Sequence, residues 1–220
     1  MTRFWSPRAA VFSACAAAVA ILPACDGNEV RVPFHHVVPV TGPVTFSLHN
    51  TAGTVRIDAW SQPSIDISGE KTGRTEDAAN AITIAVKHRG STVDVSTVYP
   101  PGTSSGGAIY VIRLPASTAV TIENAAGSVR VAGTASDVTG TIAAGTLNVT
   151  MARLTGSQHV TLSTATGTIT LHVPRSADAT IATHQTVGSV KTDLPPVLGK
   201  GTAHVDLTTT VGSIAIGWSP

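Results

Sequence analysis

The chain has 220 residues, of which 42% are hydrophobic, 12% charged and 4% aromatic, and its formal net charge is +1. An ordinary soluble domain carries roughly twice this share of charge, so uncharged polar side chains must cover most of the surface. A net charge so near zero provides no electrostatic footprint for nucleic acid or for anionic lipid, and we expect neither as a partner through charge.

Residues 1–24 have the organisation of a secretory signal peptide. Arg3 and Arg8 form a short basic start, and residues 9–22 form an apolar run without charge. This run is too short to cross a hydrocarbon core of about 30 Å comfortably as a permanent helix. We therefore predict that residues 1–24 are removed on export.

The run ends in Leu22-Pro23-Ala24-Cys25, which resembles the bacterial lipobox. The resemblance implies cleavage before Cys25 and attachment of lipid to its thiol, with acyl chains such as palmitate; an ordinary signal peptide cut near Ala24 is the alternative. After this cleavage Cys25 is the only cysteine, which excludes an intrachain disulfide and a cysteine-based metal site or nucleophile. Two or more acyl chains anchor a protein without a transmembrane helix.

Asp26 follows the predicted lipid attachment site. It resembles the residue that retains lipoproteins of enteric bacteria in the inner membrane. We therefore expect a lipid-anchored protein of the bacterial cell envelope, on the periplasmic side of the inner membrane, with the outer membrane as the alternative. Residues 25–43 contain Pro33, Pro39 and Pro43 and are predicted to form a lipidated tether that leads into one domain, 44–220.

About a third of the residues from 25 to 220 are Thr, Val or Ile, which pack well on a pleated surface and lose rotamer freedom in a helix. The domain is therefore predicted to be all-β. One unit recurs six times around a glycine. A hydroxyl residue follows each glycine. Four positions of each unit, the seventh and fifth residues before the glycine and the second and fourth after it, are apolar at 21 of 24 places. The exceptions are Gly140, Thr183 and Thr192. The glycines are Gly53, Gly127, Gly145, Gly167, Gly188 and Gly212.

Alternation on both sides of a glycine predicts a strand, a corner and a second strand with one buried face. The last five glycines recur at nearly even intervals, and their mean spacing of about 21 residues suits one coil of a parallel β-helix, or β-solenoid. We expect about eight coils with the hydroxyl residues in one column. The alternative is an antiparallel β-sandwich or barrel, and stacking of equivalent residues in register distinguishes the two.

Between residues 57 and 120 the glycine unit fades, although short strand pairs persist. Residues 75–80 are predicted to form one helical turn. Residues 99–107 and 195–201, which contain Pro and Gly, are predicted loops. Trp218 is expected to cover the end of the last coil, where open strand edges need blocking.

The units FSLHNTAGTVRI, VTIENAAGSVRV, VTLSTATGTITL and VDLTTTVGSIAI resemble the bacterial putative-adhesin family. This is a β-strand-repeat domain of unknown function, related to the head domains of putative autotransporter adhesins. The resemblance covers about residues 44–217 and implies a single-stranded, right-handed β-helix. It carries over no catalytic or binding residue.

Polysaccharide-active enzymes also use parallel β-helices, and they need paired or clustered carboxylates. The acids here are scattered, with adjacent acids only at Glu76 and Asp77. Asp58, Asp66 and Asp94 are the candidates for convergence on one face, with solvated strand or turn acids as the plainer interpretation.

The histidines are candidate metal ligands. His35 and His36 are neighbours in the predicted tether, while His159, His172 and His204 occupy outward positions. The intervals between these last three are not multiples of the coil length, which argues against one column and favours solvated surface histidines. Trp60 and Tyr110 are the candidates for a carbohydrate-stacking surface, with core or loop packing as the alternative.

We accordingly expect no catalytic residues, no cofactor and no metal ligands. The leading hypothesis is a non-catalytic, lipid-anchored β-solenoid that acts in interaction, as an adhesin or scaffold, toward an envelope protein or polysaccharide. The alternatives are a polysaccharide-active enzyme, whose acids converge only in the folded chain, and a sensory or regulatory envelope lipoprotein.

Overall fold

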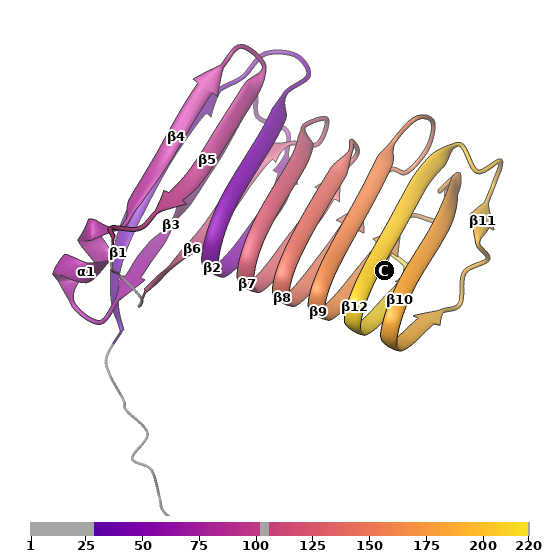
Figure 1. Ribbon diagram of the computed structural model, residues 1–220. Helices are drawn as coiled ribbons and strands as arrows, with labels where there is room; N and C mark the ends of the chain where they lie inside the picture. The colour runs from indigo at the N-terminus through magenta and orange to yellow at the C-terminus, as the bar shows by residue number, and fades with distance from the viewer. Residues whose placement is uncertain (1–28, 102–105, 220) are drawn as a thin grey trace, which may run out of the picture.

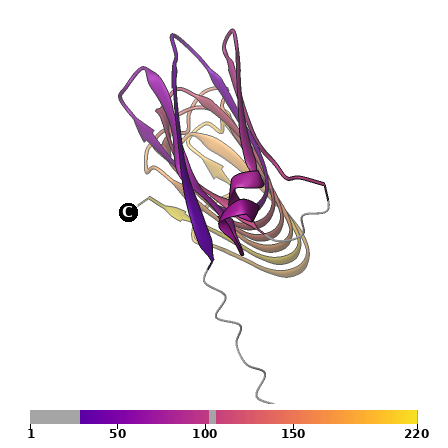
Figure 2. The same ribbon diagram turned by 90° about the vertical axis from the view of Figure 1, so that its left-hand side faces the viewer.

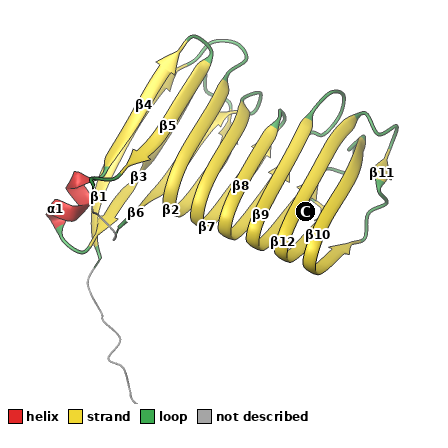
Figure 3. Cartoon of the chain, viewed as in Figure 1, coloured by secondary structure: helices red, strands yellow, loops and turns green. Residues whose placement is uncertain are grey.

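The computed structural model describes residues 29–101 and 106–219, so the predicted signal peptide and Cys25 lie outside the described residues. Strands form most of it (Figure 3), and the prediction of an all-β domain is confirmed. In chain order the elements are β1 (Val30–Pro39), β2 (Thr45–Trp60), β3 (Ser64–Gly73), α1 (Glu76–Ala81), β4 (Thr83–Arg89), β5 (Thr92–Val98), β6 (Gly107–Pro115), β7 (Ala119–Thr134), β8 (Val138–Met151), β9 (His159–Val173), β10 (Ala179–Thr192), β11 (Val197–Leu198) and β12 (Ala203–Trp218).

The strands form one large mixed sheet that does not close. Its order is β1-β3-β6-β2-β7-β8-β9-β12-β10-β11, and β5 also pairs with β2 and β4. Figure 1 shows the long strands side by side, with α1 beside β1 at one end and β11 at the other. Among the described strands, the antiparallel pairs within this order lie at its ends: β1 with β3, β3 with β6, and β10 with β11. The antiparallel pair of β4 with β5 branches from β2.

The six glycine-centred units form the parallel part of the sheet. Each unit is one long strand that bends at its glycine, and Figure 2 shows these bends nested behind one another. Neighbouring units pair in register, so that the glycines lie in one row and the hydroxyl residues after them in the next row. Within the hydroxyl row, the side chains of Thr168 and Ser213 are 3.2 Å apart and share a hydrogen bond.

The interior of the bend holds the predicted core. The four inward positions of each unit are buried in five of the six units, and the exception is β10 at the end of the stack. The two arms of a unit meet there: a Cβ at Gly140 would lie 2.9 Å from Cδ2 of Leu147. Leu147 thus fills the space of the side chain that is absent at Gly140, which explains the glycine in an otherwise apolar row.

The corner glycines are required by both conformation and space. Gly145 and Gly167 have φ values of +141° and +152°, a region that residues with a Cβ rarely adopt. A Cβ on Gly145 would also lie 1.8 Å from the carbonyl oxygen of Gly127 in the neighbouring strand. Each glycine therefore lets the next strand approach at the spacing of a β-ladder.

The units do not stack in chain order, contrary to expectation. β2 pairs directly with β7 although several elements separate them in the chain, and β5 and β6, which come between, pair with β2 instead. β12 lies between β9 and β10, so the unit before it in the chain forms the outermost long strand. The repeat predicts which residues align, but units with the same pattern can align in any order.

A carboxylate directs the chain from β11 into β12. Asp178 accepts hydrogen bonds from the backbone N–H groups of Lys200 and Thr202 at 2.8 and 3.0 Å. These bonds, led by that of Thr202, lower the pKa of Asp178. The loop at residues 199–202 is thereby held against the start of β10, and the chain re-enters the sheet beside it.

The predicted tether is folded over part of its length. Within residues 25–43, Val30–Pro39 is strand β1 and pairs with β3 along its whole length. Its alternating apolar residues, such as Phe34 and Val38, face the core, whereas the prolines suggested a linker. Pro33 and Pro39 are tolerated because β1 is an edge strand.

The predicted helical turn is confirmed as α1. The Thr75 side chain accepts a hydrogen bond from the N–H of Ala78 and caps the helix, as short hydroxyl side chains commonly do. No helix among residues 29–101 and 106–219 is long and apolar enough to span a membrane.

Candidate functional site

A groove of about 350 Å³, lined mostly by residues with polar side chains, opens at the bend of β2, β7 and β8. Its walls come from the residues just before the corner glycines, where the pairing of β2 with β7 skips Thr51 and Ala125. Thr97 of β5 closes one side. The remaining lining residues are His49, Asn50, Thr51, Glu123, Asn124, Ala125, Thr141 and Ala143.

Two asparagines form the floor of the groove. Asn50 and Asn124 lie at the same place in their units, are paired across β2 and β7, and are 7% and 3% exposed. The Asn50 amide donates to Oδ1 of Asn124 at 3.0 Å and to the carbonyl of Ala52 at 3.2 Å. Asn124 repeats this second bond to the carbonyl of Ala126, at 3.1 Å. The amides thus satisfy carbonyls at the bend.

A chain of hydroxyl groups extends from this pair into the core. Thr97 donates its hydroxyl hydrogen to Oδ1 of Asn50 at 2.8 Å, so the hydroxyl of Tyr110 must be the donor in its 2.7 Å bond with Thr97. Burial raises the pKa of Tyr110 to about 12, because the phenolate would lose its hydration. Tyr110 therefore remains a neutral donor and connects β6 to the groove through β5.

An acid and a histidine form the mouth of the groove. Nδ1 of His49 and Oε2 of Glu123 are 2.9 Å apart, and Nε2 of His49 is 3.2 Å from the hydroxyl of Ser47. The side chains of His49 and Glu123 are both more than half exposed. The mouth can therefore exchange hydrogen bonds with a polar ligand, whereas the asparagine floor is already satisfied by the protein.

Sequence reasoning missed this site, although a signal was present. Every second residue of the arm before the corner points inward. The inward positions therefore include not only the seventh and fifth residues before each glycine but also the third. That row is polar in five of six units: Asn50, Asn124, Ile142, Thr164, Gln185 and Thr209. Polar residues at an inward position need partners, and two asparagines at equivalent positions can be partners for each other.

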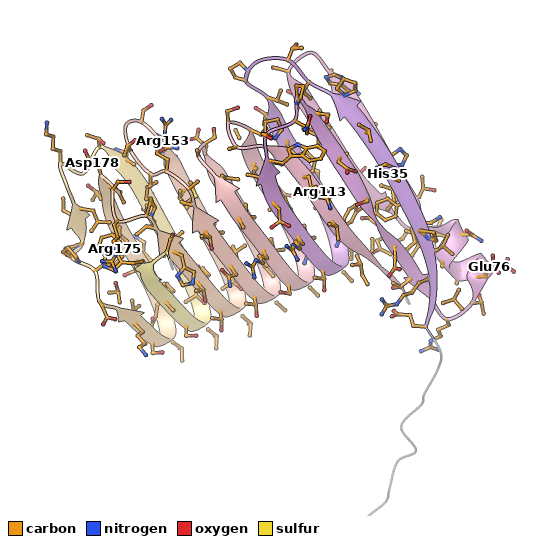
Figure 4. The ribbon with its side chains drawn as sticks, turned by 180° about the vertical axis from the view of Figure 1, so that it is seen from behind. His35, Glu76, Arg113, Arg153, Arg175 and Asp178 are labelled. Atoms are coloured by element: carbon orange, nitrogen blue, oxygen red, sulfur yellow. The ribbon has the colours of Figure 1, made fainter. Side chains whose placement is uncertain are left out.

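The predicted convergence of three acids is only partly found. Asp66 of β3 and Asp58 of β2 each pair in register with Arg113 of β6, which Figure 4 labels, so the two acids lie on the strands either side of it. The Asp58 carboxylate accepts a hydrogen bond from Arg56. Asp66 also contacts His35, with Oδ1 2.8 Å from Nε2. Asp94 pairs with Ser47 on the arm before the corner and does not join them.

The prediction that the histidines form no column is wrong for one pair. His159 of β9 and His204 of β12 are in register and stack with ring centroids 5.4 Å apart. Their separation in the chain exceeds one coil, because β12 pairs with β9 and leaves β10 outside. His172 pairs instead with Gly217, near the end of β12. Among the described residues, no three His, Cys, Asp or Glu side chains could together hold a metal ion.

The aromatic residues pack rather than form one platform. Tyr110 is buried and meets Phe34 edge to face at 5.3 Å. Trp60 donates to the carbonyl of Ser64 at 2.8 Å and lies 6.0 Å from the Arg113 guanidinium. The prediction that Trp218 covers the last coil is wrong, since it pairs with Val173 inside the stack and lies 5.9 Å from the guanidinium of Arg175.

No known family model matches the sequence, and no curated protein matches it. A crystal structure of a putative cell adhesion protein from Clostridium sporogenes is similar, with a TM-score of 0.66 and 14% identity; the match covers 86% of this chain and all of that chain. The two chains share one fold. At this identity the likeness concerns the fold alone.

Two further crystal structures match with lower scores. A putative adhesin from Bacteroides fragilis has a TM-score of 0.30 and 13% identity, over 84% of this chain and 97% of that chain. A putative lipid binding protein from Parabacteroides distasonis has a TM-score of 0.26 and 11% identity, over 86% of this chain and 97% of that chain.

Proposed function

We propose that the chain is a non-catalytic β-solenoid of the putative-adhesin family, anchored by lipid at Cys25 in the bacterial envelope. In this function it presents its outer faces to a protein or polysaccharide, as an adhesin or scaffold. The in-register row of corner glycines supports the solenoid. The fold shared with a protein described as a putative cell adhesion protein supports the interaction role.

One observation carries the proposal: the outer surface before the corner carries a row of hydroxyl side chains across β2, β7, β8 and β9. Ser47, Thr121, Thr139 and Thr161 occupy equivalent positions on four neighbouring strands. Such a row repeats its hydroxyl groups at the strand spacing of about 4.8 Å. A face with repeated hydrogen-bonding groups suits contact with an extended polymer or a broad protein surface better than enclosure of a small substrate.

Photo-crosslinking tests the interaction role. A photo-reactive residue at Thr139, on this outer row, should give a discrete adduct in the native envelope that excess unlabelled chain suppresses. The same residue at Thr180, which is exposed but belongs to the outermost long strand, should give less of that adduct. Absence of any suppressible adduct from Thr139 would contradict the proposal.

Lipid anchoring has a separate test with an internal control. Cys25→Ser should abolish labelling by a palmitate analogue and release the protein from salt-washed membranes. Cys15→Ser should retain both, because Cys15 lies inside the predicted signal peptide. Retention of Cys25→Ser in the washed membrane would overturn the anchor, and density-gradient separation of the membranes tests the inner-membrane location suggested by Asp26.

The non-catalytic assignment is supported by the setting of the acids. Asp58 and Asp66 flank Arg113 across paired strands, on an outer sheet face. If polysaccharide incubated with the full chain released reducing ends, and the double variant Asp58→Asn/Asp66→Asn did not, the enzyme alternative would replace this one.

A further inference from the structure

The two ends of the strand stack differ in how their cores are covered. At the β10 end, the two inward positions after the corner, Val190 and Thr192, are exposed. Val190 is 42% exposed, although its equivalents in the other five units are fully buried. The loop after β10 covers part of this opening, since Leu194 and Leu198 are buried. The part near the corner remains uncovered.

The backbone of β10 also has a free edge. β11 pairs only with Ala179 and Thr180, and the N–H of Ile181 donates to the carbonyl of Pro196. Beyond these, residues 182–192 pair with β12 on one side, and no described strand pairs with them on the other. An unpaired edge of this length is a template for another strand.

The opposite end is protected against such pairing. Its edge strand β1 contains Pro33 and Pro39, which cannot donate to a ladder, and its edge strand β4 ends with Lys87, His88 and Arg89. Prolines and charged residues are the usual means by which edges avoid association. β10 has no proline and no acid, and Lys191 is its only residue with a formal charge.

Exposed apolar residues concentrate at the same place. Of the six large hydrophobic residues that are exposed among those described, four lie at or beside this end: Val187, Val190, Val197 and Val211. Val187 and Val211 are neighbours in register on β10 and β12. The free edge therefore adjoins a patch whose burial would favour association.

We propose that a second copy of the chain covers this end, with the two β10 strands paired antiparallel about a two-fold axis. The middle of the free stretch 182–192 is Val187, beside the corner at Gly188. A two-fold axis that passes between Val187 and Gly188 pairs unlike arms of the two copies. The arm of β10 before the corner in one copy then runs along the arm of β10 after the corner in the second copy. A straight peptide strand would not follow the bend of β10, whereas the β10 strand of a second copy has the same bend.

The inward side chains set the register of this pairing. Gln185 of one copy lies opposite Val190 of the second, and Thr183 lies opposite Thr192. The outward neighbours are then His184 and Lys191. Because the interface is the same patch on both copies, association stops at a dimer. The inference goes beyond the proposed function and does not depend on it.

Sedimentation of the full chain in a mild detergent tests the dimer. The wild-type chain should sediment as a dimer, and Val190→Lys should raise the dissociation constant at least tenfold by placing a new charge at the uncovered core of each copy. Val37→Lys is the matched control: Val37 is 54% exposed and lies on β1 at the other end, so this variant should remain dimeric. A monomeric wild type, or dissociation by Val37→Lys but not by Val190→Lys, overturns the proposal.

Disulfide formation tests the register without dependence on a charge change. In oxidised membranes, His184→Cys/Lys191→Cys should give a covalent dimer above the background of the wild-type chain, which has its own cysteines. Each single variant should remain at background, because the proposed register places position 184 opposite position 191. A double variant at background, or a single variant that crosslinks equally, overturns the antiparallel register.

Thr186→Lys, at an exposed position of β10, replaces Val190→Lys in the sedimentation experiment if circular dichroism shows that Val190→Lys unfolds.

Discussion

At the scale of single residues, the bend of each unit is held by side chains that compensate for a disturbed ladder. Where the pairing is interrupted just before the corner, carbonyls such as that of Ala126 accept hydrogen bonds from a buried amide two residues earlier. Buried carbonyls without a donor are costly. The asparagines therefore belong to the structure, and the His49–Glu123 pair above them is exposed to a ligand.

Asn124→Ala should lower the free energy of unfolding by about 1–3 kcal/mol, because the carbonyl of Ala126 loses its amide donor and Asn50 loses an acceptor. Urea denaturation measures the change. Asn148→Ala, on the half-exposed outer side of β8, should stay within about 0.5 kcal/mol. Equal losses for the two variants would show that the buried amide has no special role.

Tyr110 should make stability fall at high pH. Its folded pKa of about 12 exceeds the ordinary value of 10.0, so the folded chain holds the proton more tightly than the unfolded chain does. The stabilisation is therefore complete below pH 10 and is lost as the pH rises through 12. Ultraviolet absorbance of the phenolate and urea midpoints between pH 9 and 12 measure the effect, and Tyr110→Phe should flatten the fall; an unchanged fall in this variant would assign it to other groups.

At the scale of elements, the glycine corner explains why so much of the architecture is readable in the sequence. Strand content, the inward positions and the alignment of glycine beside glycine all follow from local alternation and from the space that a Cβ would need. The polar inward row escaped notice because apolar positions define the pattern. β1 was missed because the prolines in and after it outweighed its alternation.

Gly145→Ala should destabilise the fold more than a change at a surface turn does. Its Cβ would meet the Gly127 carbonyl oxygen in the neighbouring strand, in addition to the strain of φ at +141°. Gly156→Ala is the matched control, since Gly156 also has a positive φ but nothing within 4 Å of the added Cβ, and it should cost about 1–2 kcal/mol. Thermal unfolding compares them; similar losses would mean that backbone strain alone selects the corner glycine.

At the scale of the whole molecule, neighbours in space are not always neighbours in the chain. β12 occupies the slot between β9 and β10, and β7 lies against β2 although β3, α1, β4, β5 and β6 come between them in the chain. Sequence could not predict this order, because all six units have matching patterns and nothing local states which unit pairs with which. The same ambiguity concealed the His159–His204 pair, which exists only because β12 adjoins β9.

Hydrogen exchange should follow the spatial order instead of the order in the chain. Amides of β12 between Gly212 and Ile216 have a strand on both sides and should exchange slowly. The amides of β10 between Val187 and Thr192 come earlier in the chain but have a neighbouring strand on one side only. They should exchange faster unless a second copy covers them. Mass spectrometry at low protein concentration, below the dimer range, measures both. Faster exchange in β12 than in β10 would contradict the strand order.

The place of β12 between β9 and β10 also means that two strands, β10 and β12, compete for the edge of β9 during folding. When the chain folds as it emerges N-terminus first, β9 has a free edge, and β10 is the first matching unit that can pair with it. β10 has the same corner glycine, followed by a hydroxyl residue. A β10 strand that settles there blocks the place of β12 and must detach before the native order can form. The final long strand, Ala203–Trp218, thus selects between two nearly equivalent stacks, and the slowest step of folding is expected to be this exchange of neighbours.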